Sequence, residues 1–336
     1  MNTNNSRPVA LTGDRTTGPL HLGHHAGSLR TRVAMQDTHD LLVMLADTQA
    51  LTDNGSDPAR IRDNVLQVMA DYIAVGIDPK RTTVFVQSGV PAIAQLSMLY
   101  LSLVSVARLE RNPTVRAEIV QKGMREIPAG FLCYPAAQAA DITAFKATVV
   151  PAGEDQAPMI EQSNEIARRV NRLAGRDVLP DSHILLSKTP RLPGVDGRAK
   201  ASKSLGNSIA LSASAEEVRA AVMAMYTDPG HVRVTDPGMV EGNVVFAHLD
   251  AFDPSPDEVS NLKDHYRRGG LGDMVLKRRL ATILEDHLAP IRERRSAALD
   301  HPDDLMDMLR DGTRRARVRA EATFAEIEDA LGLFRI

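Results

Sequence analysis

The stretch GDRTTGPLHLGHHAGSL, Gly13 to Leu29, is a glycine-rich bend between two expected elements. It follows Arg7 to Leu11, which has the character of a short strand, and from about Gly23 it has the character of a helix. The bend holds four glycines and three histidines. The first N–H groups of a helix have no partner inside it, so they point outward and favour negative charge. The sequence therefore predicts an anion site at this bend, suited to phosphate.

The rest of the first half alternates strand-like and helix-like segments. Asp57 and Pro58 are typical of a helix start, and Gly76 ends the apolar periodicity that follows them. Mostly apolar runs of strand length occupy residues 40–47, 82–88 and 147–153. This alternation predicts a parallel α/β sheet. Ligands of such sheets bind beyond the carboxyl ends of the strands, which is where the glycine-rich bend lies.

The second half of the chain has a different character. Lys188 to Asn207, KTPRLPGVDGRAKASKSLGN, has no helical or strand period and is rich in proline, glycine and lysine, so we expect a mobile loop at a domain boundary. Beyond it we expect no strands, and helices over 215–226, 272–289, 305–309 and 312–333. The predicted fold class is α/β, a Rossmann-like parallel sheet with a smaller all-helical C-terminal domain.

Composition restricts the class of protein. The 336 residues are 43% hydrophobic with a net charge of −3, which excludes a generally basic nucleic-acid coat but not a local basic face. The single cysteine, Cys133, leaves no disulfide within the chain and fits a reducing compartment. No apolar run reaches the roughly 18 residues of a membrane span, and the first seven residues lack the apolar core of a signal peptide. We therefore expect a cytoplasmic protein with no membrane partner.

His21 and His24 are the first candidates for chemistry at the bend. Their spacing is compatible with a metal site, but no cysteine or carboxylate neighbour completes a ligand set. Two imidazole donors beside glycines at a helix start suit another task, the stabilisation of charge that grows on a phosphate during nucleophilic attack. The alternative is a surface turn whose histidines are incidental.

Lys200-Ala201-Ser202-Lys203-Ser204 is a second basic element, about 180 residues downstream. Two lysines three residues apart on a pliable loop can reach two oxygens of one polyphosphate. A loop of this kind at a domain junction can close over a nucleotide and exclude water. The alternative is a pair of lysines that is simply solvated.

The two elements together resemble the signatures of a known family. His21-Leu22-Gly23-His24 is similar to the HIGH signature, and Lys200 to Ser204 to the KMSKS signature, of class I aminoacyl-tRNA synthetases. Further stretches between the two resemble motifs of the tryptophanyl branch, and they are 46–52, 109–112, 134–142, 150–156 and 194–197. The resemblance runs from about residue 8 to the C-terminus.

The resemblance implies ATP and Mg²⁺ as cofactors and assigns residues to them. His21 and His24 would stabilise the α-phosphate, and Lys200 and Lys203 would hold the departing pyrophosphate, whose charge Mg²⁺ shares. These four are the implied catalytic residues. The implied ATP-binding residues are Arg15, Thr16, Thr17, Gly23, His24, Gly153, Glu154, Asp155, Leu192, Lys200, Ala201, Ser202, Lys203 and Ser204. No metal ligand is implied in the protein itself.

The resemblance also implies a pocket for L-tryptophan. Asp141 would accept the indole N–H, and Tyr134 and Gln156 would bind the α-amino group, while Gln49 and Gln138 complete the pocket. A buried carboxylate left unpaired would penalise an amino acid that lacks the N–H. The alternative for Asp141 is an acid on a helix surface between alanines.

The same resemblance implies tRNA(Trp) as a partner and a homodimer. The expected parts are a Rossmann-like catalytic domain (1–187), a KMSKS-type loop and linker (188–207), a helical tRNA-binding domain (208–305) and a C-terminal helix (306–336) that can pack back on the catalytic domain. Basic clusters at 277–279, 292–295 and 314–319 are candidates for RNA contact, or are helix faces that are simply solvated and salt-bridged. The apolar segment Pro91 to Val106 is a candidate for dimer burial, or simply core.

Three other functions remain open at this point. A tyrosine-specific synthetase has the same architecture. A small-molecule adenylyltransferase shares the histidine turn, although the distant lysine loop and helical tail argue against it. A non-catalytic paralogue would bind amino acid or RNA as a regulator, although the intact histidines and lysines argue against that.

Overall fold

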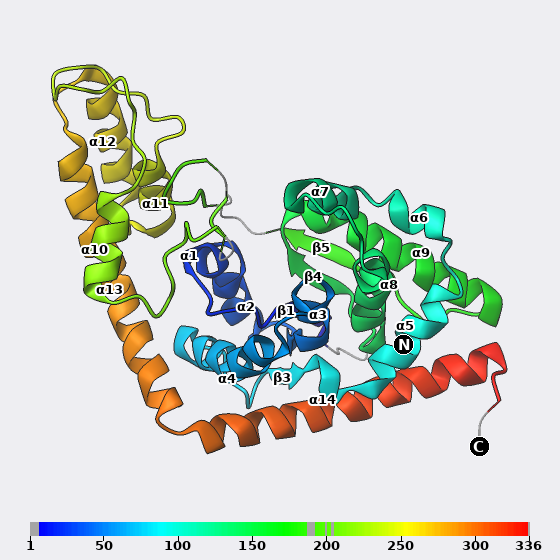
Figure 1. Cartoon of the computed structure of the whole chain (residues 1–336). Helices are drawn as coiled ribbons and strands as arrows, with labels where there is room; N and C mark the ends of the chain where they lie inside the picture. The colour runs from blue at the N-terminus through cyan, green and yellow to red at the C-terminus, as the bar shows by residue number, and fades with distance from the viewer. Residues whose placement is uncertain (1–6, 187–191, 199, 203–204, 335–336) are drawn as a thin grey trace, which may run out of the picture.

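The computed structural model describes residues 7–186, 192–198, 200–202 and 205–334. Its centre is a parallel sheet of five strands in the order β3-β2-β1-β4-β5 (Figure 1). The strands are β1 (Val9–Asp14), β2 (Asp40–Leu45), β3 (Thr83–Val86), β4 (Val149–Ala152) and β5 (His183–Leu186). The expected Rossmann-like α/β fold is confirmed. The strand order reverses between β1 and β4, and such a reversal opens a crevice for ligands at the carboxyl ends.

The strands are buried for reasons visible in their sequence. β2 runs as a nearly unbroken apolar segment, and Leu41, Val43 and Leu45 are at most 1% exposed. Such a run is what a parallel strand covered on both faces requires. β5 was not expected from the sequence, because four residues between polar neighbours give too short a pattern to separate from a loop.

Helices cover both faces of the sheet. α4 begins as expected, since the Asp57 side chain accepts from Arg60 N and Pro58 is the first helical residue, and it ends at Gly76 in the left-handed conformation (φ 104°). The other helices of this half are α1 (Leu22–His24), the π-helix η1 (His25–Leu29), α2 (Arg30–Met35), α3 (Asp47–Asn54), the 3-10 helix η2 (Gln87–Gly89), α5 (Pro91–Leu101), α6 (Val106–Glu110), α7 (Pro113–Lys122), α8 (Ala129–Ala144), η3 (Glu154–Gln156) and α9 (Ala157–Ala174).

The regular elements in the described residues of the second half are helices and two isolated bridges, His21 with Ala210 and Pro193 with Lys200, while 205–214 and 224–243 lie outside any helix. All but the last of its helices stand to one side of the sheet (Figure 1). They are α10 (Ala215–Met223), α11 (Val244–Phe252), α12 (Pro256–Arg268), α13 (Asp273–Leu299) and α14 (Pro302–Leu331). The expected C-terminal helical domain is thus present as a set of helices.

Two expected helix ends were wrong. α13 continues through Pro290, because Leu288 and Ile291 on either side of it are buried in the core and hold the helix together across the missing N–H. α14 is one helix, although its two halves were expected to be separate. Gly312 allows the helix to run this close to the sheet, because the Cβ atom of any other residue would lie 1.8 Å from the carbonyl oxygen of Val84 in β3. The glycine therefore marks a close approach of helix to strand.

α14 lies back along the catalytic half, beside β3 and α5 (Figure 1). Thr313 accepts from Val86 N at 3.2 Å through its hydroxyl, and Arg317 donates to Gly89 O at 2.7 Å. The contacts place the C-terminal helix at the edge of the sheet. The four-part division of the chain remains a prediction, and several residues of its linker (187–191, 199, 203 and 204) lie outside the described ones.

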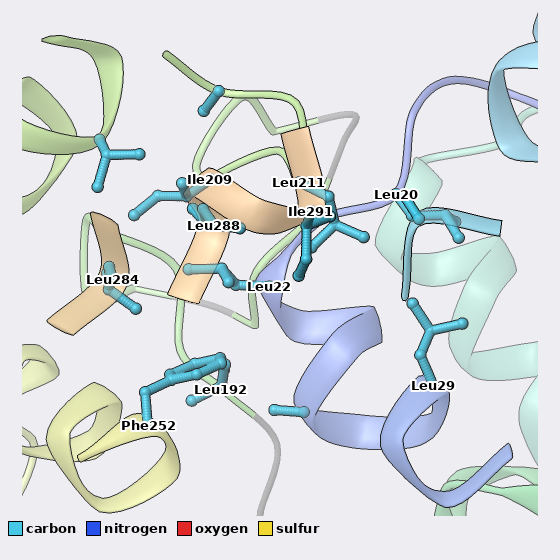
Figure 2. Close-up of a cluster of buried hydrophobic side chains, with 14 of the residues drawn as sticks. Leu20, Leu22, Leu29, Leu192, Ile209, Leu211, Phe252, Leu284, Leu288 and Ile291 are labelled. Carbon is cyan, nitrogen blue, oxygen red and sulfur yellow. The ribbon is translucent and has the colours of Figure 1, made fainter. Parts of the chain in front are cut away.

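A hydrophobic cluster joins the helical half to the start of the sheet (Figure 2). Leu284, Leu288 and Ile291 of α13 gather there with Leu22 and Leu29 of the Gly13 to Leu29 stretch. No helix in the described part of the chain combines the length and apolar character needed to span a membrane.

Candidate active site

The carboxyl ends of the parallel strands bring the expected site segments to one edge of the sheet. Arg15, Thr16 and Thr17 follow β1, and Gly153 to Asp155 follow the adjacent strand β4. Gln49 lies in the helix after β2. Thr16 is fully buried, whereas Gly153, Glu154 and Asp155 are exposed. The edge between β1 and β4 is the position where doubly wound sheets bind nucleotides.

The histidine turn, His21 to His24, is organised by its own side chains. His21 caps α1, and its Nδ1 accepts from Gly23 N at 3.1 Å. His24 Nδ1 accepts from His21 N at 3.3 Å, and the two ring centroids are 3.8 Å apart. Because each Nδ1 accepts, each ring carries its proton on Nε2 in this arrangement. The turn therefore presents two imidazole N–H donors side by side.

The lysine loop, Lys200 to Ser204, meets the histidine turn. A Cβ built on Gly23 would lie 3.4 Å from the Cβ of Ala201. Ala201 N donates to Leu192 O at 3.1 Å, and Lys200 is exposed. Two signatures distant in sequence are thus neighbours. The expected residues Lys203 and Ser204 lie outside the described ones.

Asn207 holds the loop in place and was not identified from the sequence. Its Oδ1 accepts from Ser202 N at 2.9 Å, and its Nδ2 donates to Asp196 Oδ1 at 3.1 Å. Asn207 is buried and lies three residues beyond the lysine loop, at the end of a stretch that has no periodic pattern. A single sequence contains no pattern from which this hydrogen-bonding role of Asn207 can be predicted.

An ion pair fixes the end of β1 immediately before the bend. Arg32 contacts Asp14 Oδ2 at 2.5 Å, and the Tyr72 hydroxyl donates to the same oxygen at 2.8 Å. Burial alone would raise the pKa of Asp14, but Arg32, with a smaller contribution from His24, holds that pKa well below its usual range. The carboxylate therefore stays ionised and anchors the strand from which the histidine turn begins.

Three expected tryptophan-site residues share one face of α8. Tyr134, Gln138 and Asp141 follow one another at spacings of four and three, which places them in line along a helix. Tyr134 is 6% exposed with its ring 5.5 Å from that of Phe131, and Gln138 is half-buried. Asp141 is 2% exposed, so it is not an acid on a helix surface.

The two carboxylate oxygens of Asp141 differ in their hydrogen bonds. Its Oδ1 accepts from Gln87 Nε2 at 2.8 Å, whereas its Oδ2 has no hydrogen-bond partner among the described residues. Burial raises the pKa of Asp141 to about 7, and the Gln87 hydrogen bond opposes that rise. Asp141 Oδ2 is therefore a buried oxygen with hydrogen-bonding capacity to spare, in line along α8 with Tyr134 and Gln138.

Gln87 is a residue of the site that sequence reasoning missed. Besides donating to Asp141, its Oε1 accepts from Gln49 N at 2.9 Å. It thereby links Gln49 of α3 to Asp141 of α8. One signal was available, since Gln87 lies at the carboxyl end of the strand expected over 82–88.

Gln156 and Asp155 lie across the sheet edge after β4. Gln156 Nε2 donates to Asp155 Oδ2 at 3.3 Å, and Thr114 Oγ1 donates to the backbone oxygen of Asp155 at 2.9 Å. Asp155 and Gln156 are therefore held next to each other.

Most of the expected basic clusters serve the fold. Arg279 binds Asp253 at 2.7 Å and also Glu258, and Lys277 donates to Met223 O at 2.8 Å. Arg278 between them is exposed. Further arginines with partners inside the chain are Arg292, Arg294, Arg295, Arg314, Arg315, Arg317 and Arg319. The ion pairs among these contacts fit the alternative of salt-bridged helix faces, and contact of the clusters with RNA stays a prediction.

A Rossmann-like sheet whose histidine turn meets a lysine loop defines the class of protein. The family described as tRNA synthetases class I (W and Y) matches residues 3–289, and the chain belongs to this family. Among its relatives are proteins named tryptophan–tRNA ligase. The one from Streptococcus pyogenes serotype M3 is 51% identical, over 98% of this chain and 99% of the relative, and the one from Streptococcus pneumoniae serotype 4 is 52% identical, over 98% of both chains.

A solved structure agrees with this family. The tryptophanyl-tRNA synthetase from Campylobacter jejuni, complexed with ADP and tryptophan, superimposes with a TM-score of 0.82 at 27% identity. The match covers 96% of this chain and 99% of that one. The arrangement of helices and sheet described above is therefore shared with a tryptophanyl enzyme over nearly its whole length.

Proposed function

We propose that the site at the carboxyl ends of β1 and β4 performs the activation of tryptophan. The chain joins L-tryptophan to ATP, giving tryptophanyl-adenylate and pyrophosphate, and then transfers the tryptophanyl group to tRNA(Trp). The observation that carries the proposal is the contact between Gly23 of the histidine turn and Ala201 of the lysine loop. This contact brings the imidazole donors of the histidine turn close to the lysine loop. Both can then act on one triphosphate, as transfer from a triphosphate requires.

The phosphates would lie between the histidine turn and the lysine loop. The Nε2–H groups of His21 and His24 donate to the α-phosphate as the tryptophan carboxylate attacks it, and that charge grows in the transition state. Lys200 and Lys203 take the charge of the leaving pyrophosphate. Mg²⁺ enters with the triphosphate and neutralises part of its charge. Arg15, Thr16, Thr17, Ser202 and Ser204 complete the phosphate surroundings.

The adenosine would lie along the edge between β1 and β4. Gly23 lets the nucleotide approach the backbone closely. Gly153, Glu154 and Asp155 hold the ribose, since a carboxylate is a good acceptor for its hydroxyls. Leu192 packs near the adenine, and its carbonyl already binds Ala201 N.

The tryptophan would lie over α8. Asp141 Oδ2 accepts the indole N–H, and Tyr134 and Gln156 bind the α-amino group. Gln49 and Gln138 line the pocket. A phenol hydroxyl could also donate to Asp141, so the carboxylate alone does not exclude tyrosine; the named relatives at 51% and 52% identity favour tryptophan. An unpaired Asp141 would disfavour phenylalanine strongly.

We also propose a homodimer that works in the cytoplasm. The buried face of α5 belongs to the core, but Met98 on its other face is 69% exposed and Val106, at the start of α6, is 60% exposed. Exposed apolar side chains on neighbouring elements are candidates for burial against a second copy. The single Cys133 suits a reducing compartment.

ATP–pyrophosphate exchange with each of the twenty amino acids tests the activity. We expect exchange that depends on tryptophan. Exchange with tyrosine and none with tryptophan would reassign the substrate. No exchange with any amino acid would favour the non-catalytic paralogue.

A further inference from the structure

The backbone just before the histidine turn is held from two sides. On one side is the segment that follows the lysine loop, where Leu22 N donates to Ile209 O at 2.9 Å and Leu211 N donates to Leu20 O at 2.9 Å. On the other side is Asp71 of α4, whose Oδ2 accepts from Leu20 N at 2.7 Å. Leu20 is therefore fixed through both its carbonyl oxygen and its amide nitrogen.

Asp71 is a charged residue in the interior of the molecule. Its exposed fraction is 0%, and a carboxylate there needs a partner of opposite charge. Arg295 of α13 supplies that partner, with Nε 2.6 Å from Asp71 Oδ1, and its other nitrogen donates to Gln67 Oε1 at 2.6 Å. One ion pair thus joins the C-terminal helical half to the amide of Leu20.

α13 makes two further hydrogen bonds in this region, from Arg292 to Ala213 O at 2.9 Å and from Arg294 to Ala74 O at 2.7 Å, and neither reaches Leu20. Apolar contacts add to these. Leu284, Leu288 and Ile291 pack in one cluster with Leu20 and Leu22 (Figure 2). Hydrophobic contact has no direction, so it allows small displacements along the interface. A hydrogen bond to an ionised group is directional and strong. The Asp71 carboxylate therefore sets the position of this backbone more sharply than the leucines do.

We infer that Asp71 and Arg295 are positioning residues for His21. The imidazole of His21 accepts from Gly23 N, so the orientation of the ring follows the backbone that Asp71 holds at Leu20. A displacement of about 1 Å at a reacting group can cost roughly 100-fold in rate. The inference rests on the proposed function, because it concerns the step in which His21 meets the α-phosphate.

Three variants separate positioning from folding. Arg295→Met removes the arginine that pairs with the buried Asp71 carboxylate, and it is expected to lower stability as well as rate. Asp71→Leu with Arg295→Met removes both charges, which often restores stability, but it leaves Leu20 N without its acceptor. Arg295→Lys keeps one charge and one hydrogen bond. The measurements are single-turnover adenylate formation, tryptophan binding and thermal unfolding.

Arg279→Met is the matched control. Arg279 lies on the same helix, about 24 Å along it from Arg295, and it also pairs with a carboxylate whose side chain is 0% exposed, that of Asp253. This variant should lower the melting temperature and leave the rate of adenylate formation unchanged. It therefore reports what a purely structural loss in α13 does to the enzyme.

The double variant should form adenylate roughly 10- to 100-fold more slowly, with tryptophan binding changed less than about threefold. Arg295→Lys should fall between it and the unchanged chain. A double variant at full rate, equal losses in rate and tryptophan binding, or an equal loss in Arg279→Met would each overturn the positioning role. If the protein without substitutions shows no pyrophosphate exchange, that result would instead contradict the proposed function.

Discussion

Gly23 faces Ala201 so closely that a Cβ atom on Gly23 would lie 3.4 Å from the Cβ of Ala201. The same atom would lie 2.9 Å from the ring of His21, which is closer than real Cβ contacts come. The histidine turn and the lysine loop, about 180 residues apart in sequence, therefore lie close together at Gly23 and Ala201. There is no room for a side chain at residue 23 unless the imidazole of His21 moves.

Gly23→Ala should slow adenylate formation by roughly 10- to 100-fold, because the new methyl group displaces the His21 ring from the phosphate. Tryptophan binding should change little, since the pocket over α8 is separate from the turn. Single-turnover kinetics and equilibrium binding of tryptophan measure the two effects. A variant that forms adenylate at the original rate would show that the His21 ring position is unimportant.

Asp141→Asn should weaken tryptophan binding and relax specificity. The amide keeps the shape of the carboxylate but loses its charge, and a charged hydrogen bond contributes about 1.5–3 kcal/mol. We expect the KM for tryptophan to rise roughly 10- to 150-fold, with a smaller rise for phenylalanine. Pyrophosphate exchange with both amino acids measures this, with Gln138→Asn as a control in the same pocket. Unchanged discrimination would remove Asp141 from the recognition of tryptophan.

Tryptophan binding should depend on pH near neutrality. The pKa of Asp141 is raised to about 7, so the carboxyl group is mostly protonated at pH 6 and ionised at pH 8. Only the ionised group is purely an acceptor, so affinity for the indole N–H should increase as pH rises through 7. Gln87→Leu removes the hydrogen bond that opposes the raised pKa and should move the transition to higher pH. Calorimetric titrations between pH 5.5 and 8.5 (a range chosen to bracket about 7) measure it, and a flat profile would contradict the assignment.

Acid should destabilise the contact between η1 and α13. His25 Nδ1 is 3.3 Å from His287 Nε2, and the pKa values of the two are lowered, mainly by burial, to about 3 and about 4. In the unfolded chain both bind protons near pH 6.5. The unfolded state therefore holds more protons between about pH 6.5 and pH 4, and stability falls as pH decreases through that window.

His287→Leu should flatten this acid dependence, because it removes one of the two buried bases. The free energy of unfolding by urea, measured at several values between about pH 4 and pH 7, provides the comparison. A slope equal to that of the unchanged chain would mean that other groups cause the acid loss. His265→Leu on α12 is a suitable control, since His265 is exposed.

The sheet and its site edge could be predicted because their signals are local. The apolar run at 40–45 and the cap at Asp57 each point to one element, and both are present. The partners of these residues could not be predicted. Gln87 reaches Asp141 across 54 positions of sequence, and Arg295 reaches Asp71 across 224. Side chains that meet only after folding leave no periodic pattern in one sequence.

The helices of the C-terminal half were harder to predict for a related reason. Glycine and proline are unfavourable inside helices, and the expected helices stopped before Pro290 and were divided just before Gly312. Both lie inside continuous helices instead. In each case tertiary contact outweighs local preference. At Pro290 the neighbouring Leu288 and Ile291 are buried, and at Gly312 the helix packs onto strand β3.

Gly312→Ala should destabilise the protein by about 3 kcal/mol or more, a large effect for one methyl group. The Cβ would meet the carbonyl oxygen of Val84 at 1.8 Å, and neither the strand nor the 30-residue helix can move without disturbing its neighbours. Gly27→Ala is the control, because a Cβ there meets nothing within 4 Å and alanine favours the helix. Urea unfolding of both variants measures the difference. If the two variants unfold at the same concentration, α14 does not press on β3 at Val84, and the account of why this helix is unbroken is wrong.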